Sequence, residues 1–513
     1  MSKRKTKVTF KTYTPNQIML LPPSLDEKIA EHHPVRVVSQ VIDKINITPL
    51  EKKYQGGGTS SYHPKMLLKV MVYAYLTNIY SSRKMEEALQ QNIYFMWLSG
   101  MSEPDHNTIN RFRGERLKEV LKPIFVQVVQ LLAEAGLVSL KELYTDGTKL
   151  EANANRYTFV WGKAIKTNKE KMKQQLEELW RYAQKTAAEE LKDEEELVFE
   201  EIDAEKVKAT IAKIDEVLAG KEEVSKQVKQ KLNYAQKHWP DNLKRYEEQE
   251  KILGKRNSFS KTDNDATFMR MKEDHLKNGQ LKPGYNVQIS TNNQVITNYT
   301  LHPNPTDTTT LSTHVEEHKK LYKEIPQTIT TDAGYGSEEN YDYLEKNQIE
   351  AFVKFNTFDK EQKKNYAEKN PFHQNQLHYN REKDCFTCPM GQAMNKLRIE
   401  KQKSDTGYEK EVHVYEAKNC ANCPLRGMCH DAEGHRTIRV NHRLRYYQQQ
   451  AKQKLNTEEG IRHRKKRCCD VEPVFANLKH NKKFKRYNLR GTKKAEIETG
   501  LLAIAHNIMK MAA

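Results

Sequence analysis

The sequence predicts an α/β protein in which a mixed sheet with flanking helices follows an N-terminal all-helical domain. Three observations support this fold class. Apolar residues recur at helical spacing before residue 135, and short β-prone runs alternate with helical stretches after residue 257. A highly charged segment between these two parts carries apolar residues at heptad-like spacing. We therefore expect a helical insertion within the α/β part.

The composition favours a basic protein with several domains. A chain of 513 residues is long enough for two or three domains, each with its own core. The mean hydropathy of −0.88 is low for a compact enzyme, so part of the chain should be solvated helix or polar loop. The net charge of +18 favours a polyanionic partner such as nucleic acid. The alternative is a basic surface without such a partner.

Neither a membrane span nor a secretory signal is expected. The chain has no run of 18 apolar residues. Its start, Met1–Lys5, is basic but lacks the apolar stretch of a signal peptide. All seven cysteines follow residue 384, whereas a secreted disulfide framework would spread them through the fold. This clustering indicates metal binding in a reducing compartment.

Residues 1–135 are predicted to form the helical N-terminal domain. Proline in a first turn at His63-Pro64-Lys65 begins one helix. A later helix is expected to be capped by Asp105 or Asn107. Three polar residues of that helix are expected to project to solvent and contact DNA, as in a helix-turn-helix: Asn110, Arg111 and Arg113. The alternative is an ordinary helical bundle with solvated arginines.

The charged insertion is predicted over residues 163–256. Its apolar stripes, with Glu and Lys between them, indicate a helical hairpin or a small antiparallel bundle. Such stripes usually serve packing. The sequence leaves open whether the insertion makes a dimer contact or braces DNA.

The α/β part is predicted over residues 138–162 and 257–513. Leu143–Asp146 and Ile325–Asp332 read as strands that end at a carboxylate. A hairpin is expected between Tyr285 and Tyr299, and a C-terminal helix over Ala495–Met511.

Three acidic residues are the candidates for chemistry. Asp146 and Asp332 close β-prone runs, and Glu472 is expected at the start of a helix. Asp470 could cap that helix with Pro473 in its first turn. Such a trio can hold two Mg²⁺ or Mn²⁺ ions, about 4 Å apart, for phosphoryl transfer. The alternative for each aspartate alone is a turn, because Asp near Gly is a common turn former.

The cysteines predict a small zinc-knuckle insertion over residues 383–435. Two C-x₂-C pairs and one further cysteine suit structural Zn²⁺. These five candidate ligands are Cys385, Cys388, Cys420, Cys423 and Cys429. Spacing alone favours the two pairs as the four ligands.

Basic runs flank the glutamate on both sides, where phosphates of a bound DNA would lie. Such contacts set affinity and salt dependence more than sequence preference. The alternative for each run alone is a solvated charged face. The candidate DNA-binding residues of these runs are Arg464, Arg467, Lys479, Lys482, Lys483 and Arg486.

Four segments of the chain resemble a known family. Asp146–Asn155, Thr331–Tyr335 and Val471–Phe475 resemble the three catalytic blocks of DDE transposases of the IS1182 group, within the IS4/IS5-like set. The helical segment from Pro15 to Leu117 resembles the N-terminal domain of that group. The resemblance runs along nearly the whole chain and in the same order.

The resemblance implies an RNase H-like catalytic domain and metal-dependent cut-and-paste transposition. Asp146, Asp332 and Glu472 map onto the three metal-binding acids of the family. Relatives carry a tyrosine-arginine-glutamate-lysine signature, and Lys479 fits its lysine. Lys465 and Cys468 stand at the tyrosine and arginine positions, and Arg467, one place away, is the candidate replacement for the arginine.

The family also implies ligands and partners. Its cysteine block favours Cys388, Cys420, Cys423 and Cys429 as the zinc ligands and leaves Cys385 spare. The expected partners are double-stranded DNA, as transposon terminal repeats and target, and a second copy of the chain. The expected location is the cytoplasm of a bacterium, on the nucleoid. The alternatives are an inactive, transposase-derived DNA-binding protein and an RNase H-like nuclease without strand transfer.

Overall fold

The N-terminal part is all helical, as its apolar spacing predicts. The computed structural model describes residues 24–54, 60–186, 202–219, 221, 224–271, 280–369 and 371–512. Asp105 caps α6, because its carboxylate accepts a hydrogen bond from the Thr108 N–H at 2.7 Å. The elements are α1 (Pro34–Lys44), α2 (Thr48–Glu51), α3 (Pro64–Leu76), α4 (Ser82–Gln91), α5 (Ile93–Ser99), α6 (His106–Arg111), η1 (Phe112–Arg116) and α7 (Leu121–Glu134).

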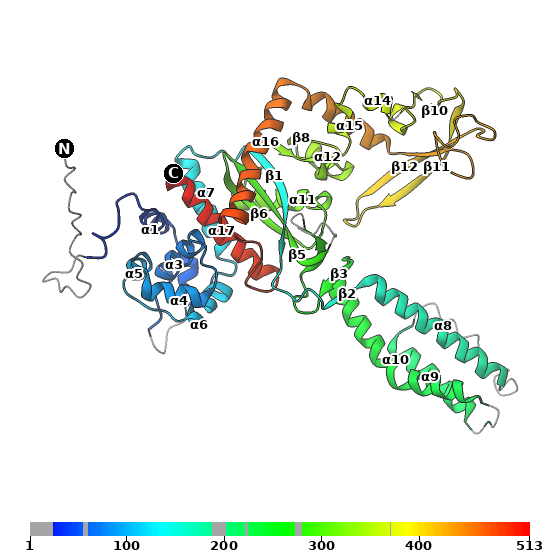
Figure 1. The fold of residues 1–513 in the computed structure, drawn as a ribbon, viewed down its shortest axis with the longest axis horizontal. Coiled ribbons are helices and arrows are strands. Elements are labelled where there is room, and N and C mark those ends of the chain that lie inside the picture. Colours follow the sequence, from blue (N-terminus) through cyan, green and yellow to red (C-terminus); the bar gives the residue numbers. More distant parts are fainter. Residues whose placement is uncertain are drawn as a thin grey trace, which may run out of the picture.

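A mixed sheet occupies the centre of the molecule (Figure 1). Its strand order is β4-β5-β1-β7-β8, and β6 pairs with β5 outside this path. β1 is antiparallel to β5 and parallel to β7, and β7 is parallel to β8. The strands are β1 (Glu142–Glu151), β4 (Thr267–Arg270), β5 (Leu281–Asn292), β6 (Val295–His302), β7 (Thr328–Thr331) and β8 (Glu350–Val353). The structure therefore confirms the mixed α/β class.

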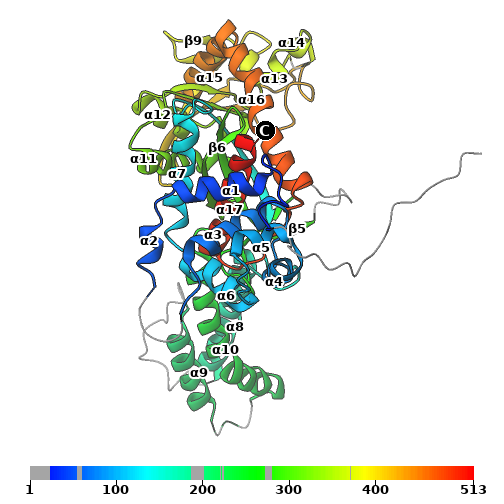
Figure 2. The same ribbon diagram turned by 90° about the vertical axis from the view of Figure 1, so that its left-hand side faces the viewer.

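The C-terminal half adds further helices, most of which contact this sheet. They are α11 (Leu311–Tyr322), α12 (Glu338–Lys346), α13 (Phe358–Glu361), α14 (Tyr366–Lys369), α15 (His442–Leu455), α16 (Glu458–Ala476) and α17 (Thr492–Ala512). α17 packs against α3, α7 and β6, so one hydrophobic core joins the N-terminal helices to the sheet. Figure 2 shows α17 beside α1 and α3. The helical N-terminal part therefore shares its core with the end of the chain.

The charged insertion forms an arm of three helices. α8 (Gly162–Thr186), α9 (Ala204–Leu218) and α10 (Lys226–Leu253) pack around their own apolar core. The arm leaves the body between β2 (Phe159–Trp161) and β3 (Ser258–Ser260), which pair with each other. Figure 1 shows it extending away from the sheet. The expected helical bundle is thus present in the described part of this segment.

The cysteine-rich segment forms a second, antiparallel sheet. Its order is β13-β12-β11-β10-β9, with β11 and β12 as a long ribbon. The strands are β9 (Tyr379–Asn380), β10 (Cys385–Thr387), β11 (Ala393–Lys403), β12 (Glu409–Ala417) and β13 (Thr437–Val440). We call residues 379–440 the cysteine module. Its sheet was not part of the sequence prediction.

Two predicted element boundaries are wrong. The strand expected to end at Asp146 continues to Glu151, because β5 pairs with β1 along this whole stretch. The helix expected to begin near Glu472 begins at Glu458, with Thr457 as its cap. Pro473 therefore lies inside α16. Among the described residues, no helix is both long and apolar enough to cross a membrane.

Candidate active site

Asp146 lies on β1, and Asp332 directly follows β7, the parallel neighbour of β1. The pairing of β1 with β7 runs from Glu142 opposite Thr328 to Tyr144 opposite Thr330. Each aspartate follows two residues after the last pair, so the register brings the two positions together. Asp146 is only 8% exposed, and its Oδ1 accepts a hydrogen bond from the Gly147 N–H at 2.7 Å. The Asp332 Oδ1 accepts one from the Gly334 N–H at 2.9 Å.

Arg467 connects Asp146 to Glu472. Its Nη1 lies 3.2 Å from the Asp146 Oδ2, and its Nη2 lies 3.3 Å from the Glu472 Oε1. Both carboxylates therefore face one guanidinium, although their positions in the sequence are far apart. The Glu472 side chain is 55% exposed, so this side of the site opens to solvent.

His463 holds α16 against the sheet one turn before Arg467. Its Nδ1 lies 3.1 Å from the Tyr144 hydroxyl and 3.3 Å from the Thr330 Oγ1, and its ring stacks on Phe352. These contacts span β1, β7 and β8. They hold α16 in place against β1 and β7.

Asp470 does not cap the helix as predicted. Its two carboxylate oxygens accept hydrogen bonds from the Asn293 N–H at 2.8 Å and the Gln294 N–H at 3.0 Å. Both residues form the turn between β5 and β6 and have positive φ values of 52° and 61°. The carboxylate therefore ties α16 to this turn, two residues before Glu472.

A fourth carboxylate at this site was missed by the sequence prediction. Asp307 begins η2 (Asp307–Thr309), after β6, and its Oδ1 accepts hydrogen bonds from the Asn286 Nδ2 at 2.7 Å and the Gln288 Nε2 at 2.8 Å. A Cβ added at Gly147 would collide with Asp307 and with Gln288. Asp307 follows Asn304-Pro305-Thr306. No local pattern distinguishes it from a turn residue, so only the fold reveals it.

The pKa of Tyr335 is affected by the negative charge of the site. Its ring is fully buried, and its hydroxyl donates to the Gln288 Oε1. Burial, and then the charges of Asp307, Asp146 and Asp332, raise the pKa of Tyr335 well above its ordinary value. Arg467 is the cation that opposes this shift. Three carboxylates are thus close enough to act on one phenol.

The donor set suits a hard cation. Among the residues that the structure describes, no three His, Cys, Asp or Glu side chains are grouped so as to hold a metal ion as they stand. The predicted ligands offer only carboxylate oxygens, which Mg²⁺ and Mn²⁺ prefer. The Arg467 guanidinium also occupies the space between Asp146 and Glu472, so these carboxylates already share one positive charge. The predicted ligands are therefore of the chemical type that a divalent cation prefers, but the described side chains are not arranged around a metal position.

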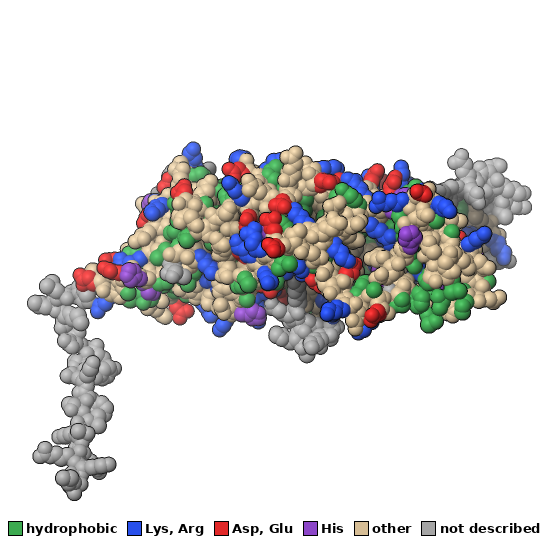
Figure 3. Space-filling model, turned by 90° about the horizontal axis from the view of Figure 1, so that it is seen from above, with side chains coloured by type: hydrophobic (Ala, Val, Ile, Leu, Met, Phe, Trp, Pro, Cys, Tyr) green, Lys and Arg blue, Asp and Glu red, His purple; other side chains and the backbone are tan. Residues whose placement is uncertain are grey.

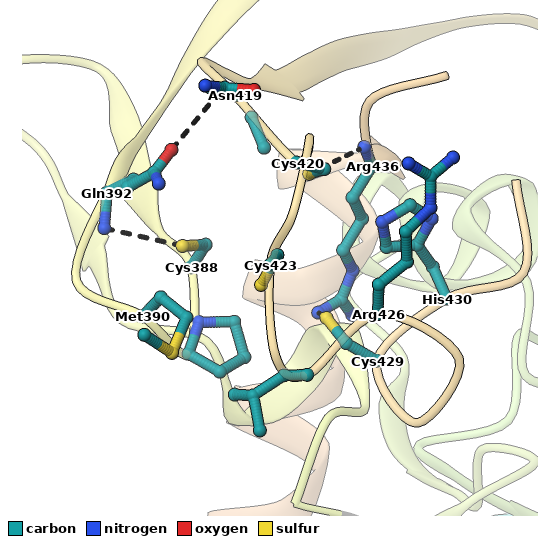
Figure 4. A pocket seen from close by; sticks show the side chains of 13 residues that line it. Cys388, Met390, Gln392, Asn419, Cys420, Cys423, Arg426, Cys429, His430 and Arg436 are labelled. Carbon is teal, nitrogen blue, oxygen red and sulfur yellow. Dashed lines mark hydrogen bonds between the residues drawn. The ribbon is translucent and has the colours of Figure 1, made fainter. Parts of the chain in front are cut away.

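Four cysteines line one small pocket in the cysteine module. They are Cys388, Cys420, Cys423 and Cys429 (Figure 4). The cavity is about 20 Å³, room for about one water-sized sphere. The Gln392 N–H donates to the Cys388 Sγ at 3.3 Å, and the Arg436 N–H donates to the Cys420 Sγ at 3.4 Å. These contacts would also stabilise thiolates, and four cysteine thiolates are a ligand set that zinc prefers.

Two features of this pocket bear on the predicted ligand sets. Cys385 does not line it and lies instead in β10, paired with β9 and β11. The Arg436 Nη1 donates to the Cys429 Sγ at 2.8 Å. The grouping of cysteines is therefore the one that the family resemblance favours, and a guanidinium lies against one of the four sulfur atoms.

Three of the predicted DNA-binding residues are buried. Arg113 is 3% exposed, so the prediction that it projects to solvent is wrong. Its Nη1 donates to the Tyr80 carbonyl at 2.6 Å. Lys482 is 5% exposed and donates to the Leu76 carbonyl at 3.1 Å, and burial lowers its pKa to about 8. Lys479 is 8% exposed. These three side chains do not form an open basic face.

The other predicted contacts reach the surface. Asn110, Arg111 and Lys483 are exposed. Arg464 is half-buried with its guanidinium over the Phe358 ring, and Arg486 donates to the Ala152 carbonyl at 3.2 Å while staying partly exposed. Figure 3 shows Lys and Arg side chains spread among acidic ones on one face of the molecule. Contact of these residues with DNA stays a prediction.

Two family models match the chain. The transposase DDE domain matches residues 387–512, a range that contains Glu472 and the four pocket cysteines. The transposase domain DUF772 matches residues 23–115, which cover the N-terminal helices up to η1. Asp146 and Asp332 lie outside both ranges. No curated protein and no solved structure matches the chain.

Proposed function

We propose, from the premise that the chain carries the two domains typical of IS1182-family transposases, that it cleaves transposon-end DNA and joins the 3′-hydroxyl to target DNA. One observation carries this proposal. The fold brings Asp146 and Asp332 together on β1 and β7, and Arg467 brings Glu472 to Asp146. Three acids that are far apart in the sequence thus lie near the β1–β7 pair of strands.

The three acids are proposed to hold two Mg²⁺ or Mn²⁺ ions. When bound, the ions would activate the attacking oxygen and stabilise the leaving oxygen of a phosphodiester. β1 and β7 hold the two aspartates rigidly, and α16 presents Glu472 from the solvent side. The strand order, with three antiparallel strands followed by two parallel to the first, supports an RNase H-like assignment for this sheet.

Arg467 has a second proposed part in this reaction. In the structure its guanidinium forms ion pairs with both Asp146 and Glu472. Cations bound to these acids would compete with it, and the released guanidinium is then free to contact a DNA phosphate. This would give Arg467 the role expected for the arginine of the family signature, although it stands one place away.

The substrate is proposed to be double-stranded DNA. Water would attack the phosphodiester at the transposon end and free a 3′-hydroxyl, which would then attack a target phosphodiester. The basic balance of the chain and the exposed Arg111 and Lys483 support a polyanionic partner. Two ends must be joined in one event, so a homodimer is the proposed working unit.

The test is cleavage and joining of DNA that carries both ends of the encoding element. We expect Asp146→Asn and Asp332→Asn each to lower end cleavage in Mg²⁺ or Mn²⁺ by roughly 100-fold or more, since each removes a proposed ligand. Asp359→Asn, which changes a surface aspartate paired with Lys354, is the control and should keep full activity.

DNA with pre-cut transposon ends distinguishes a transposase from a nuclease without strand transfer. A transposase joins a pre-cut 3′-hydroxyl end to target DNA, whereas a nuclease without strand transfer cleaves but does not join. Unchanged cleavage by Asp332→Asn would show that the active-site assignment is wrong. Binding of end DNA without cleavage by the unaltered protein would identify an inactive DNA-binding relative.

A further inference from the structure

Three arginines are bound through their Nε atoms to three consecutive residues at the end of β1. The donors and their acceptors are Arg156 to the Glu151 Oε1 at 2.9 Å, Arg486 to the Ala152 carbonyl at 3.2 Å and Arg490 to the Asn153 carbonyl at 3.1 Å. We call Arg156, Arg486 and Arg490 the arginine cluster. Although they come from two distant parts of the chain, their guanidinium groups are gathered around the same three residues.

Each arginine of the cluster keeps at least one terminal nitrogen for a further acceptor. Within the described residues, the Nη1 atoms of Arg156 and Arg486 donate no hydrogen bond, and neither terminal nitrogen of Arg490 does. The Arg156 and Arg486 side chains are 41% and 46% exposed, and Arg490 is exposed as well. A planar guanidinium that is held at one side and free at the other is oriented to bind a phosphate oxygen.

The charge around the end of β1 is positive. The Glu151 carboxylate forms ion pairs with Arg156 at 2.9 Å, Lys282 at 3.8 Å and Arg486 at 3.9 Å. In the described part of the chain, no second carboxylate forms an ion pair with any of these three cations. Asp265 accepts from a backbone N–H two residues after the last arginine of the cluster and adds a second negative charge. The cations still outnumber the anions, so a polyanion is the partner that complements this surface.

The arginine cluster reaches β1 at the edge that also pairs with β7. β5 pairs with the opposite edge of β1 along the strand. β7 pairs with β1 only as far as Tyr144, and Arg486 forms a parallel bridge with Glu151 further along. Asp146 lies on β1 between these two contacts. Asp146 and Glu151 are five positions apart in the strand, which is roughly 16 Å at about 3.3 Å per residue.

This spacing fits a DNA duplex that runs from the proposed active site over the cluster. B-DNA rises about 3.4 Å per base pair, so roughly 16 Å corresponds to about five base pairs. Phosphates recur at every base pair of a duplex, so a duplex cut beside Asp146 would present phosphates at this distance.

We propose that the arginine cluster binds the DNA backbone about five base pairs from the phosphodiester that is cut, and so holds the transposon end against the active site. This inference rests on the proposed function. It adds a defined phosphate-binding surface to it, and two of the three arginines, Arg156 and Arg490, are not among the contacts predicted from the sequence.

The first test is the salt dependence of binding of a duplex that carries one end of the element, measured by fluorescence anisotropy with the full chain. We compare the slopes of the logarithm of the binding constant against the logarithm of the salt concentration. Arg156→Ala and Arg490→Ala should each reduce the size of this slope by about one, because each removes a phosphate contact. Arg156→Lys keeps the charge and should keep the slope.

Arg398→Ala is the matched control for these variants. Arg398 also binds a carboxylate, that of Glu400, through its Nε and Nη2, and its side chain is 52% exposed. It lies on β11 in the cysteine module, away from β1. Its replacement should leave the slope as it is in the unaltered protein.

The second test locates the contact on the DNA. A methylphosphonate removes the charge of one phosphate, and about five base pairs from the cut it should weaken binding by the unaltered protein about threefold. A protein with both Arg156→Ala and Arg490→Ala should bind the modified and the unmodified duplex equally well, because its contact with that phosphate is already lost.

The outcomes separate this inference from the proposed function. If the unaltered protein cuts the end DNA and the cluster variants keep its slope, the inference is overturned and the proposed function stands. An equal reduction of slope in Arg398→Ala, or an equal effect of the methylphosphonate on the doubly substituted protein, would also overturn the inference. If the unaltered protein neither binds nor cuts the end DNA, the proposed function fails as well.

Discussion

Arg113 joins the N-terminal helices to α17 through a buried charge pair. Its Nη1 lies 3.8 Å from the Glu498 Oε1, and both side chains are almost fully buried. The Tyr75 hydroxyl donates to the same Glu498 oxygen at 2.9 Å. A buried carboxylate that loses its cationic partner is costly, because its charge is left uncompensated. Arg113 therefore matters for stability first.

We predict that Arg113→Ala lowers the free energy of unfolding by about 3–5 kcal/mol. Arg111→Ala, at the exposed neighbouring position, should change it by less than about 0.5 kcal/mol. Urea titration followed by circular dichroism measures both values. If Arg111 contacts a phosphate, Arg111→Ala should weaken the salt dependence of DNA binding. The slope of the logarithm of the binding constant against the logarithm of the salt concentration should then fall in size by about one. Equal stability of the two variants would contradict the role given to Arg113.

The sequence identifies the candidate acids of the site, but it does not predict which side chains are buried. Asp146, Asp332 and Glu472 stand in short motifs that can be read locally. Whether Arg113 faces DNA or Glu498 depends on α17, which is far away in the sequence, so helical spacing alone could not decide it. Asp307 was missed for the same reason, since its partners Asn286 and Gln288 belong to another strand.

At the scale of elements, the cysteine module is the clearest case for metal-linked folding. Its own apolar cluster is small and includes Phe386, Tyr415 and Cys420. Small modules of this kind commonly need a metal or disulfides for stability, and the described cysteines form no disulfide. The pocket cysteines are therefore expected to stabilise the module by holding zinc.

We predict that the purified protein holds one zinc ion per chain, and that Cys423→Ser and Cys429→Ser each lose most of it. Cys385→Ser should keep zinc if the four pocket cysteines are the ligands. Cys468→Ser, at an exposed position on α16, is the control. Elemental analysis of the protein measures the content. Loss of zinc from Cys385→Ser, with retention in Cys429→Ser, would favour the two C-x₂-C pairs instead.

The elements themselves were largely predictable, whereas their ends were not. Heptad-like apolar spacing predicted the helical arm, and its three described helices share a core. The start of α16 was misplaced because Asp470 and Pro473 look like a helix start. In the fold, Asp470 binds the turn between β5 and β6 and Thr457 caps the helix fifteen residues earlier in the chain than Glu472.

At the scale of the whole molecule, the main core contains several uncharged histidines. Burial lowers the pKa of His302, His318 and His506 to about 4. Each would titrate near 6.5 in an unfolded chain, so the unfolded state binds more protons between these two values. The neutral histidines therefore contribute fully to the free energy of unfolding above about pH 6.5. This contribution falls as the pH drops towards 4.

We predict that the free energy of unfolding decreases between pH 6.5 and pH 4, by up to about 3 kcal/mol for each of the three histidines. His318→Leu should flatten this dependence. Neither ring nitrogen of His318 has a hydrogen-bond partner within the described structure, so the replacement sacrifices no such bond. Denaturant titrations at several pH values measure the effect. An equal slope in the variant and the unaltered protein would rule out a contribution from His318.

The position of α16 and α17 in the chain has a consequence for protein synthesis. A ribosome adds roughly 5–20 residues per second, so β1 emerges tens of seconds before the helix that carries Glu472. Until then Asp146 lacks both Arg467 and Glu472, and the core that α17 shares with α3 and α7 remains open. A nascent chain therefore has neither the contacts of Arg467 with the two carboxylates nor the closed core until α16 and α17 have been made.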